Sequence, residues 1–350
     1  MLAELISPTD ARWPAVLEQL SHDVYHLPEY TQFAAEVESA TGAAFLVEEN
    51  ATHLFIPVLL RKLPRELDPE QKFQDVISPY GYPSPVASLA SSGSAPGRLW
   101  AGVQRIASDH NLVSAFLRSH PLLPLPALQG MPVTRTVEGK TVWIDLDRPH
   151  ADVVADFRSG HRYDIRKLER QGFQVVIGDW SRLDEFIDVY IGTMERVLAS
   201  PNYFHSSKYF AALKSALREK LEIIVVLAPD GRVAAAALFS EYRGVVQYLF
   251  SGTAAAFVRL APSKLLIAAA VQWASSRGNT QFHLGGGVGS RDDSLFAFKS
   301  GFSKRRAEYS TIRWIFDLDA YERLCRAKGI EGVSEYFPAY RSNDGAIPDL

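Results

Sequence analysis

One lysine of this chain stands among residues that could build a site for negative charge. Lys299 lies between Phe298 and Gly301-Phe302, and it follows Gly285–Gly289, a stretch with four glycines in five residues. Glycine adopts positive φ and lets a ligand approach the backbone closely. A lysine in an apolar setting can hold a phosphate or a carboxylate, or stabilise an oxyanion. The ordinary alternative is a snorkelling lysine on a packed helix; residue types alone leave both interpretations open.

The glycine-rich stretch is not a nucleotide-binding loop, because its spacing fits neither the Walker pattern nor GxGxxG. Asp292, Asp293 and Ser294 follow it and offer N-caps for a short helix that would carry Lys299. We therefore expect a glycine turn at the end of a strand, with the lysine just beyond it.

A row of arginines forms a second charged feature. Arg158, Arg162, Arg166 and Arg170 recur every four residues, and Lys167 lies beside them. Residues four apart share one face of a helix, so the row predicts a positive stripe. Such a stripe is either a solvated helix face or a surface that contacts phosphates, including those of RNA.

Composition limits the classes of protein that fit. The chain has 350 residues, 37 basic and 40 acidic, so no global basic excess indicates nucleic-acid binding. The single cysteine, Cys325, excludes a disulfide framework and a cysteine-based zinc site. His22 and His26 have helical spacing but no third ligand, so no metal site is expected. Without a secretory start or an uninterrupted apolar run, we expect a soluble cytoplasmic protein, with peripheral membrane contact left open.

The elements that would position these residues read most clearly in the second half. There the order is one strand, two helices, a three-strand meander, a helix, a strand, a short helix and a last strand. Pro229-Asp230-Gly231 and Arg243-Gly244 mark the turns of the meander. The first half shows a weaker version of the same order. We expect two tandem α+β domains at 1–150 and 173–318, a basic connecting helix at 151–172, and a closing helix and tail at 319–350.

Several segments together resemble a known family, the FemAB-type aminoacyltransferases, which are tandem GNAT-fold proteins related to the BioF-associated GNAT acyltransferases. The resemblance covers nearly the whole chain and is densest after His161. The segments that carry it are the glycine-ended strand followed by Leu295–Phe302, the loop Ser78–Pro85, the segment Arg162–Gly172, the entry around His26-Leu27-Pro28, and Phe337–Arg341. The resemblance implies two GNAT-like domains, each a mixed sheet flanked by helices.

The resemblance also implies roles for particular residues. Amide formation needs an amine nucleophile, help with proton loss and stabilisation of a tetrahedral oxyanion. The expected catalytic residues are Lys299, for charge stabilisation, and Tyr248, as a hydroxyl. Glu241 or Asp292 is a candidate base. The expected substrate-binding residues are Tyr80, Tyr82, His205, Tyr209 and Arg291, where histidine at 205 replaces the arginine that would hold a diphosphate. The residues expected to bind phosphate or tRNA are Arg162, Arg166, Lys167 and Lys264.

The acyl donor remains open between two classes. GNAT enzymes that use CoA bind its pyrophosphate on backbone amides of a glycine-rich turn at a helix N-terminus. The corresponding segment here is Arg259–Lys264, in which Pro262 removes an N–H donor and Lys264 replaces a small residue. This favours aminoacyl-tRNA as donor, no bound cofactor, and a peptidoglycan precursor or peptide as acceptor. The alternatives are a CoA-dependent N-acyltransferase acting on an envelope sugar or another small amine, and a non-catalytic GNAT-like binding protein.

Overall fold

The computed structural model describes residues 1–88, 96–128, 130–332, 334 and 336–342. The chain divides into two compact units. The first is formed by Met1–Glu138 and the described residues from Tyr309 onward, and the second by Gly139–Glu308. Strands β7 (Val133–Asp145) and β13 (Arg306–Ile315) contribute residues to both units.

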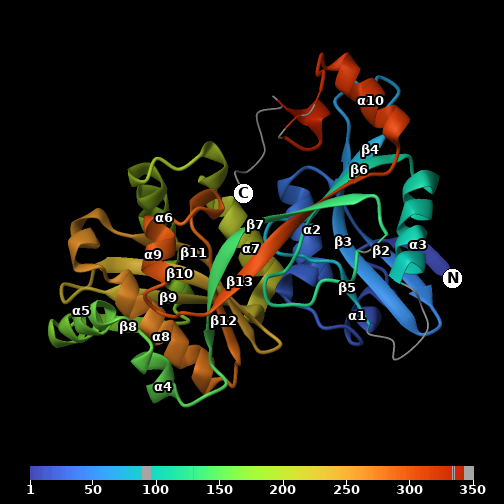
Figure 1. The fold of residues 1–350 in the computed structure, drawn as a ribbon. Helices are drawn as coiled ribbons and strands as arrows, with labels where there is room; N and C mark the ends of the chain where they lie inside the picture. Colours follow the sequence, from blue (N-terminus) through green and yellow to red (C-terminus); the bar gives the residue numbers. More distant parts are fainter. Residues whose placement is uncertain (89–95, 129, 333, 335, 343–350) are drawn as a thin grey trace. The chain divides into compact units, whose positions relative to one another are not determined.

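The first unit is a mixed sheet with helices on both faces (Figure 1). Its strands run in the order β1-β2-β3-β4-β6-β13, with β5 beside β3. The neighbours β4 and β6 are parallel, whereas the other pairs are antiparallel. The elements of this unit before β7 are β1 (Leu2–Ile6), α1 (Arg12–Leu17), η1 (Val24–His26), α2 (Pro28–Val37), β2 (Thr41–Glu49), β3 (Thr52–Lys62), β4 (Gln74–Ile77), β5 (Val86–Ala87), α3 (Pro96–Asp109) and β6 (Leu112–Arg118). After β13 come α10 (Leu318–Ala327) and η7 (Ala339–Arg341).

The alternation of apolar residues along the strands explains the two helix layers of the first unit. On β2, Phe45 and Val47 join the core formed with Trp100 and Ile106 of α3. Leu59 of β3 instead packs with the alanines of α2 on the opposite face. The sheet is therefore buried on both sides, as its near-continuous apolar runs require.

The closing motif Phe337–Arg341 ties the end of the chain to the first unit. The Tyr340 hydroxyl lies 2.9 Å from the Ser114 hydroxyl of β6. Arg341 pairs through Nε with Asp75 of β4, a fully buried carboxylate that also accepts from Arg61 Nε at 2.9 Å. Residues 343–350 of the predicted tail lie outside the described residues.

The second unit is a mixed sheet in the order β7-β12-β11-β10-β9-β8. After β7 its elements are α4 (His150–Ala155), α5 (Ser159–Arg170), β8 (Gln174–Ile177), η2 (Trp180–Arg182), α6 (Leu183–Arg196), η3 (Pro201–Tyr203), α7 (Ser207–Leu217), η4 (Arg218–Lys220), β9 (Leu221–Leu227), β10 (Val233–Tyr242), β11 (Val245–Thr253), η5 (Ala255–Leu260), α8 (Ser263–Ser276), β12 (Gln281–Gly285), η6 (Val288–Ser290) and α9 (Ser294–Lys299).

Helices α8 and α6 cover opposite faces of the second sheet. Ala235, Ala237 and Phe239 of β10 join a core with the apolar residues of α8. On the other face α6 approaches β11 closely, because a Cβ added at Gly252 would lie 2.3 Å from the backbone oxygen of Val189. Glycine is therefore required at residue 252 by the α6–β11 contact.

The compact units differ from the domain boundaries that we expected. The second unit starts at Gly139 instead of at residue 173, and it includes the basic helix α5 that was expected to be a connection. The physical reason is that α5 buries His161, Ile165 and Leu168 within this unit, where Ile165 and Leu168 join the core around α8. The helix α10 belongs to the first unit, where Ala320 and Leu324 pack with Val113 and Tyr340.

No helix in the described part of the chain is long and apolar enough to cross a membrane. Within the same residues no group of three or more histidine, cysteine, aspartate or glutamate side chains is placed so that it could hold a metal ion.

Candidate functional site

Two parallel strands separate in the middle of the second sheet. The pairing of β11 with β12 covers only Val245–Gln247 and Gln281–His283. Beyond these residues β11 continues to Thr253, whereas Gly285 of β12 pairs with Val142 of β7. The carboxyl ends of neighbouring parallel strands are where open α/β sheets bind ligands.

Lys299 lies at this separation. Its side chain is buried, and Nζ donates a hydrogen bond to the backbone oxygen of Gly286 at 2.7 Å. Nζ also lies 5.9 Å from the ring centroid of Tyr248 on β11, within the range of a cation–π interaction. Gly285 has φ of 78°, and a Cβ added there would lie 3.3 Å from Nζ. The predicted lysine, tyrosine and glycines therefore meet at the ends of β11 and β12.

Burial sets the protonation of this cluster. Desolvation lowers the pKa of Lys299 from 10.5 to about 8, against the opposing effect of the Asp293 carboxylate. Lys299 is therefore mostly protonated at neutral pH, yet it can release its proton much more readily than an exposed lysine. Burial raises the pKa of Tyr248 to about 12, so its hydroxyl keeps its proton and can act as a hydrogen-bond donor.

The turn before α9 is held by Asp293. Its carboxylate caps the helix by accepting from the Phe296 amide at 2.8 Å, and it accepts from the Val288 amide at 3.0 Å. A Cβ at Gly287 would lie 2.4 Å from Asp293 Oδ1, so glycine permits this closure. Of the three N-caps expected from the sequence, Asp293 is the one used. Arg291 is exposed on the same turn, where it can reach a ligand in solvent.

His161 of α5 was missed by the sequence analysis. Its ring packs on Phe302 with a centroid distance of 4.6 Å, and Nε2 lies 3.0 Å from the backbone oxygen of Phe298. A Cβ at Gly301 would lie 2.2 Å from Nε2. His161 thus fixes the end of α9 against α5. A glycine two residues after Lys299 was the sequence signal for this close contact.

His205 and Tyr209 form an aromatic stack. Their ring centroids lie 3.9 Å apart, and the Tyr190 ring lies nearly parallel to His205 at 6.2 Å. Burial lowers the pKa of His205 to about 4, so the imidazole is neutral at pH 7. His205 can therefore contact a phosphate only as a hydrogen-bond donor, and it does not supply the positive charge of the arginine that it replaces.

Two positions at the start of α8 offer no free amide to a pyrophosphate. Pro262 has no N–H, and the Lys264 amide donates to the Ala261 oxygen at 3.0 Å. The Lys264 ammonium pairs with the Asp164 carboxylate of α5. A phosphate at Lys264 would have to compete with this ion pair.

The arginine row lies on the solvent side of α5. Arg166, Lys167 and Arg170 are exposed, while Arg162 is half-buried and donates to the Ala155 oxygen. Tyr163 is 60% exposed beside them. The predicted positive stripe is present, and an exposed aromatic ring lies next to it.

Tyr80 and Tyr82 lie in the first unit, in the loop that follows β4. Tyr80 is 43% exposed, and its backbone oxygen accepts from the Tyr30 hydroxyl at 2.9 Å. The ring of Tyr82 packs against Tyr309 at 5.3 Å and Tyr25 at 6.0 Å. The loop predicted to hold a ligand is therefore an aromatic cluster with one ring reaching solvent.

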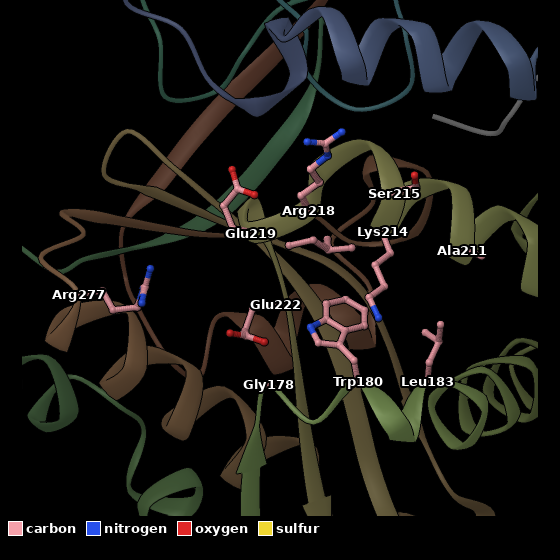
Figure 2. Close-up of a pocket in the computed structure, with 11 residues that line it drawn as sticks. Gly178, Trp180, Leu183, Ala211, Lys214, Ser215, Arg218, Glu219, Glu222 and Arg277 are labelled. Carbon is pink, nitrogen blue, oxygen red and sulfur yellow. The ribbon is translucent and has the colours of Figure 1, made fainter.

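A groove of about 820 Å³ opens elsewhere on the second unit (Figure 2). Figure 2 shows Lys214 reaching toward Trp180, whose ring centroid lies 4.4 Å from Nζ, and Arg218 pointing away from Glu222. The groove lies at the start of β9, whereas Lys299 lies beside the end of β12. Because β9 and β12 are both parallel to β11, the groove and Lys299 occupy opposite ends of the sheet.

The comparisons with known proteins agree with this geometry. Residues 155–300, all of them in the second unit, match the family described as an acetyltransferase (GNAT) domain. No curated protein sequence matches the chain. The crystal structure of FemX is similar over 92% of this chain and 99% of that one, with a TM-score of 0.73 and 14% sequence identity.

The fold is that of FemX. Two further solved structures share it at 15% identity. The structure of L-PGS from Bacillus licheniformis has a TM-score of 0.54 and is matched over 93% of this chain and 98% of that one. The C-terminal domain of a putative lysylphosphatidylglycerol synthetase from Agrobacterium fabrum has a TM-score of 0.52, over 92% and 98%. The predicted resemblance to FemAB-type proteins and the tandem GNAT-like fold are confirmed, and the matches point to an acyltransferase.

Proposed function

We propose that this protein is an aminoacyltransferase that moves an aminoacyl group from aminoacyl-tRNA to an amine of a peptidoglycan precursor or peptide. The observation that carries the proposal is Lys299: a buried ammonium at the ends of two separating parallel strands, in a chain with the fold of FemX. A preorganised donor in a water-poor site stabilises the charge that develops during acyl transfer.

The chemistry follows from the position of Nζ. The acceptor amine attacks the ester carbonyl of the donor, and the carbonyl oxygen becomes an oxyanion. Lys299 donates a hydrogen bond to that oxygen. When the C–O bond to the ribose breaks, the amide forms and the ribose oxygen takes up the proton that the amine gives up. With a pKa of about 8, Lys299 is suited both to stabilise the oxyanion and to pass that proton on.

The start of α8 supports tRNA over CoA as donor. The pyrophosphate of CoA needs free amides at this helix terminus, yet Pro262 has none and the Lys264 amide is already bonded. The exposed stripe of α5, with Arg166 and Lys167, offers a surface on which a nucleic-acid backbone can lie without base specificity.

The test is an aminoacyl-transfer assay with pools of charged tRNA and three acceptor classes. These are a muropeptide precursor, short amine-bearing peptides, and vesicles that contain phosphatidylglycerol, since two of the similar structures bear lipid-synthetase names. We expect acceptor-dependent deacylation with the wild-type protein, and a rate about 10²–10³-fold lower with Lys299→Met. If no acceptor stimulates deacylation of any tRNA, the proposal is wrong. Transfer to vesicles alone would show that the acceptor is a lipid and not a peptidoglycan precursor or peptide.

A parallel titration with acetyl-CoA and longer acyl-CoA thioesters separates the CoA-dependent alternative. The protein is expected not to bind them, because the amide cradle is incomplete. Saturable binding of an acyl-CoA together with inactivity toward charged tRNA would replace the proposed donor.

A further inference from the structure

Two arginines lie on the same face of the first sheet. Arg118 ends β6 and Arg313 lies on the neighbouring strand β13. In the antiparallel register Thr311 faces Arg118, and Arg313 faces Phe116. Side chains directly opposite one another, and those two residues apart on one strand, point to the same face. Arg118 and Arg313 are therefore diagonal neighbours, a relation that places such residues roughly 7–8 Å apart.

The Arg118 side chain is buried, and no described carboxylate is bonded to it. It is 8% exposed, and the structure gives its guanidinium no hydrogen bond or ion pair with a described residue. The guanidinium carbon Cζ of Arg118 lies 5.7 Å from the ring centroid of Phe116 and 5.9 Å from the ring centroid of Tyr80. The two carboxylates of this region have partners of their own. Asp23 pairs with His120, and Glu138 accepts from Thr311, the residue opposite Arg118.

Arg313 on the neighbouring strand is half-buried. Its Nε is buried and has no hydrogen-bond partner among the described residues. Its guanidinium lies 5.9 Å from the ring centroid of Phe337, and this ring contacts Phe116 at 6.4 Å. The two cations thus flank a pair of phenylalanine rings.

Two other arginines of this unit show the contrast. Arg61 and Arg341 both pair with the buried Asp75 through Nε. An unpaired buried charge is destabilising by several kcal/mol, as an order of magnitude, and like charges on adjacent strands add repulsion. Stability alone does not explain a second pair of arginines to which no described carboxylate is bonded.

We propose that Arg118 and Arg313 form an anion-binding site in the first unit, with a phosphate or carboxylate group as its ligand. The planar guanidinium matches both groups through two parallel N–H···O bonds. Phe116 and Phe337 form an apolar floor that keeps water from competing. The exposed ring of Tyr80, over which Arg118 lies, supplies a contact for the rest of the ligand. This site is made only of first-unit residues and does not depend on the proposed transfer reaction.

The experiment is a binding titration of the whole protein at constant ionic strength, set with sodium chloride. The probes are inorganic phosphate, pyrophosphate, acetate and succinate, and the readouts are calorimetry and the ligand-induced rise of the thermal midpoint. We expect one phosphate or carboxylate probe to bind in preference to chloride. Arg118→Met and Arg313→Met should abolish that binding, and Arg118→Lys should weaken it about tenfold by losing the two-pronged contact.

The control is Arg135→Met, which removes an exposed arginine of the same unit that bonds Ser310, and it should bind as the wild type does. Without ligand, Arg118→Met should be at least as stable as the wild type, because it removes a buried charge. Its loss of binding can therefore be interpreted even if another variant fails to fold. Two results would overturn the proposal: no probe competes with chloride, or binding is unchanged in both Arg118→Met and Arg118→Lys.

Discussion

At the residue scale, burial has two opposing effects on Lys299: it strengthens the electrostatic effect of the ammonium and lowers its proton affinity. Burial at the ends of β11 and β12 makes the ammonium an effective electrostatic group, and the same burial weakens its hold on a proton. Activity and stability should therefore both depend on pH through this one side chain.

The first prediction concerns catalysis. Lys299→Met should lower kcat for acyl transfer by about 10²–10³-fold, the usual effect of losing one oxyanion donor. In the wild type the rate should fall as pH rises through about 8, where Lys299 loses its proton. Lys299→Arg, if active, should move that fall to higher pH, because arginine keeps its charge. Rate profiles from pH 6 to 10 check this, and an identical fall in the arginine variant would exclude Lys299 as its source.

The second prediction concerns stability. In the unfolded chain Lys299 has its ordinary pKa of 10.5, and in the folded chain about 8. Between these values the unfolded state binds more protons, so the free energy of unfolding rises with pH. Relative to Lys299→Met, the wild type should gain up to about 3 kcal/mol between pH 8 and 10.5, at about 1.4 kcal/mol per pKa unit. Denaturant unfolding at several pH values measures the difference; parallel curves for the two proteins would contradict it.

At the element scale, the position of Lys299 depends on how α9 is held at both ends. Asp293 fixes the start through its cap, and His161 of α5 fixes the end at Gly301. The contact between α5 and α9 is a backbone-to-ring contact, which leaves no space for a side chain.

The third prediction tests this contact. Gly301→Ala should destabilise the protein by about 1–3 kcal/mol through overpacking, because the new Cβ would lie 2.2 Å from His161 Nε2. In a double-mutant cycle, His161→Ala should relieve most of that loss, with a coupling energy of about 1 kcal/mol or more. As a positioning residue, His161 should also affect kcat more than KM. Additive free energies of unfolding would show that the two residues do not act together.

The fourth prediction concerns α5. Replacing Arg162, Arg166 and Lys167 with alanine should weaken tRNA binding for all sequences alike. Each lost phosphate contact should reduce the slope of log Kd against log salt by about 0.7–0.9.

A matched control for α5 removes the same charge elsewhere. Lys72, Arg98 and Arg326 are all exposed in the first unit, with side chains 58–65% exposed. Their triple alanine variant should keep the wild-type affinity and salt slope. If both triple variants weaken binding equally, net charge and not the α5 stripe is responsible.

At the scale of the whole molecule, the sequence predicted the order of elements and the fold class, because turns such as Arg243-Gly244 and the apolar runs of the strands are local signals. The position of Lys299 could be predicted in part, since a glycine-ended strand and a following cap place the lysine; its role stays a prediction. The assignment of segments to the first or the second unit could not be predicted from the sequence. It depends on contacts between residues far apart in the chain, such as Thr311 with Glu138. His161 and the pair Arg118–Arg313 were missed because only strand register and packing bring their partners together.

The fifth prediction concerns the independence of the first unit. Joining Glu138 to Tyr309 through a short Gly-Ser linker, without 139–308, should leave a cooperatively folding protein. The contact of Glu138 with Thr311 and that of Arg135 with Ser310 bring the two cut ends together. Near-ultraviolet circular dichroism should retain the signal of Trp100 against Trp314, whose rings lie 5.7 Å apart. Loss of a sharp thermal transition would show that the first unit requires the second.

The return of the chain into the first unit has a consequence for its biosynthesis. The described residues of the second unit form one continuous segment, which can complete its core as it leaves the ribosome. The first unit cannot, because β13 joins β6 and arrives about 200 residues after it. Until then the β6 edge that will receive β13 stays open, and Ala115 and Leu117 lack Ile312 and Trp314. The first unit is therefore synthesised first but completed last. Its open β6 edge is where a chaperone would bind or where misassembly would begin.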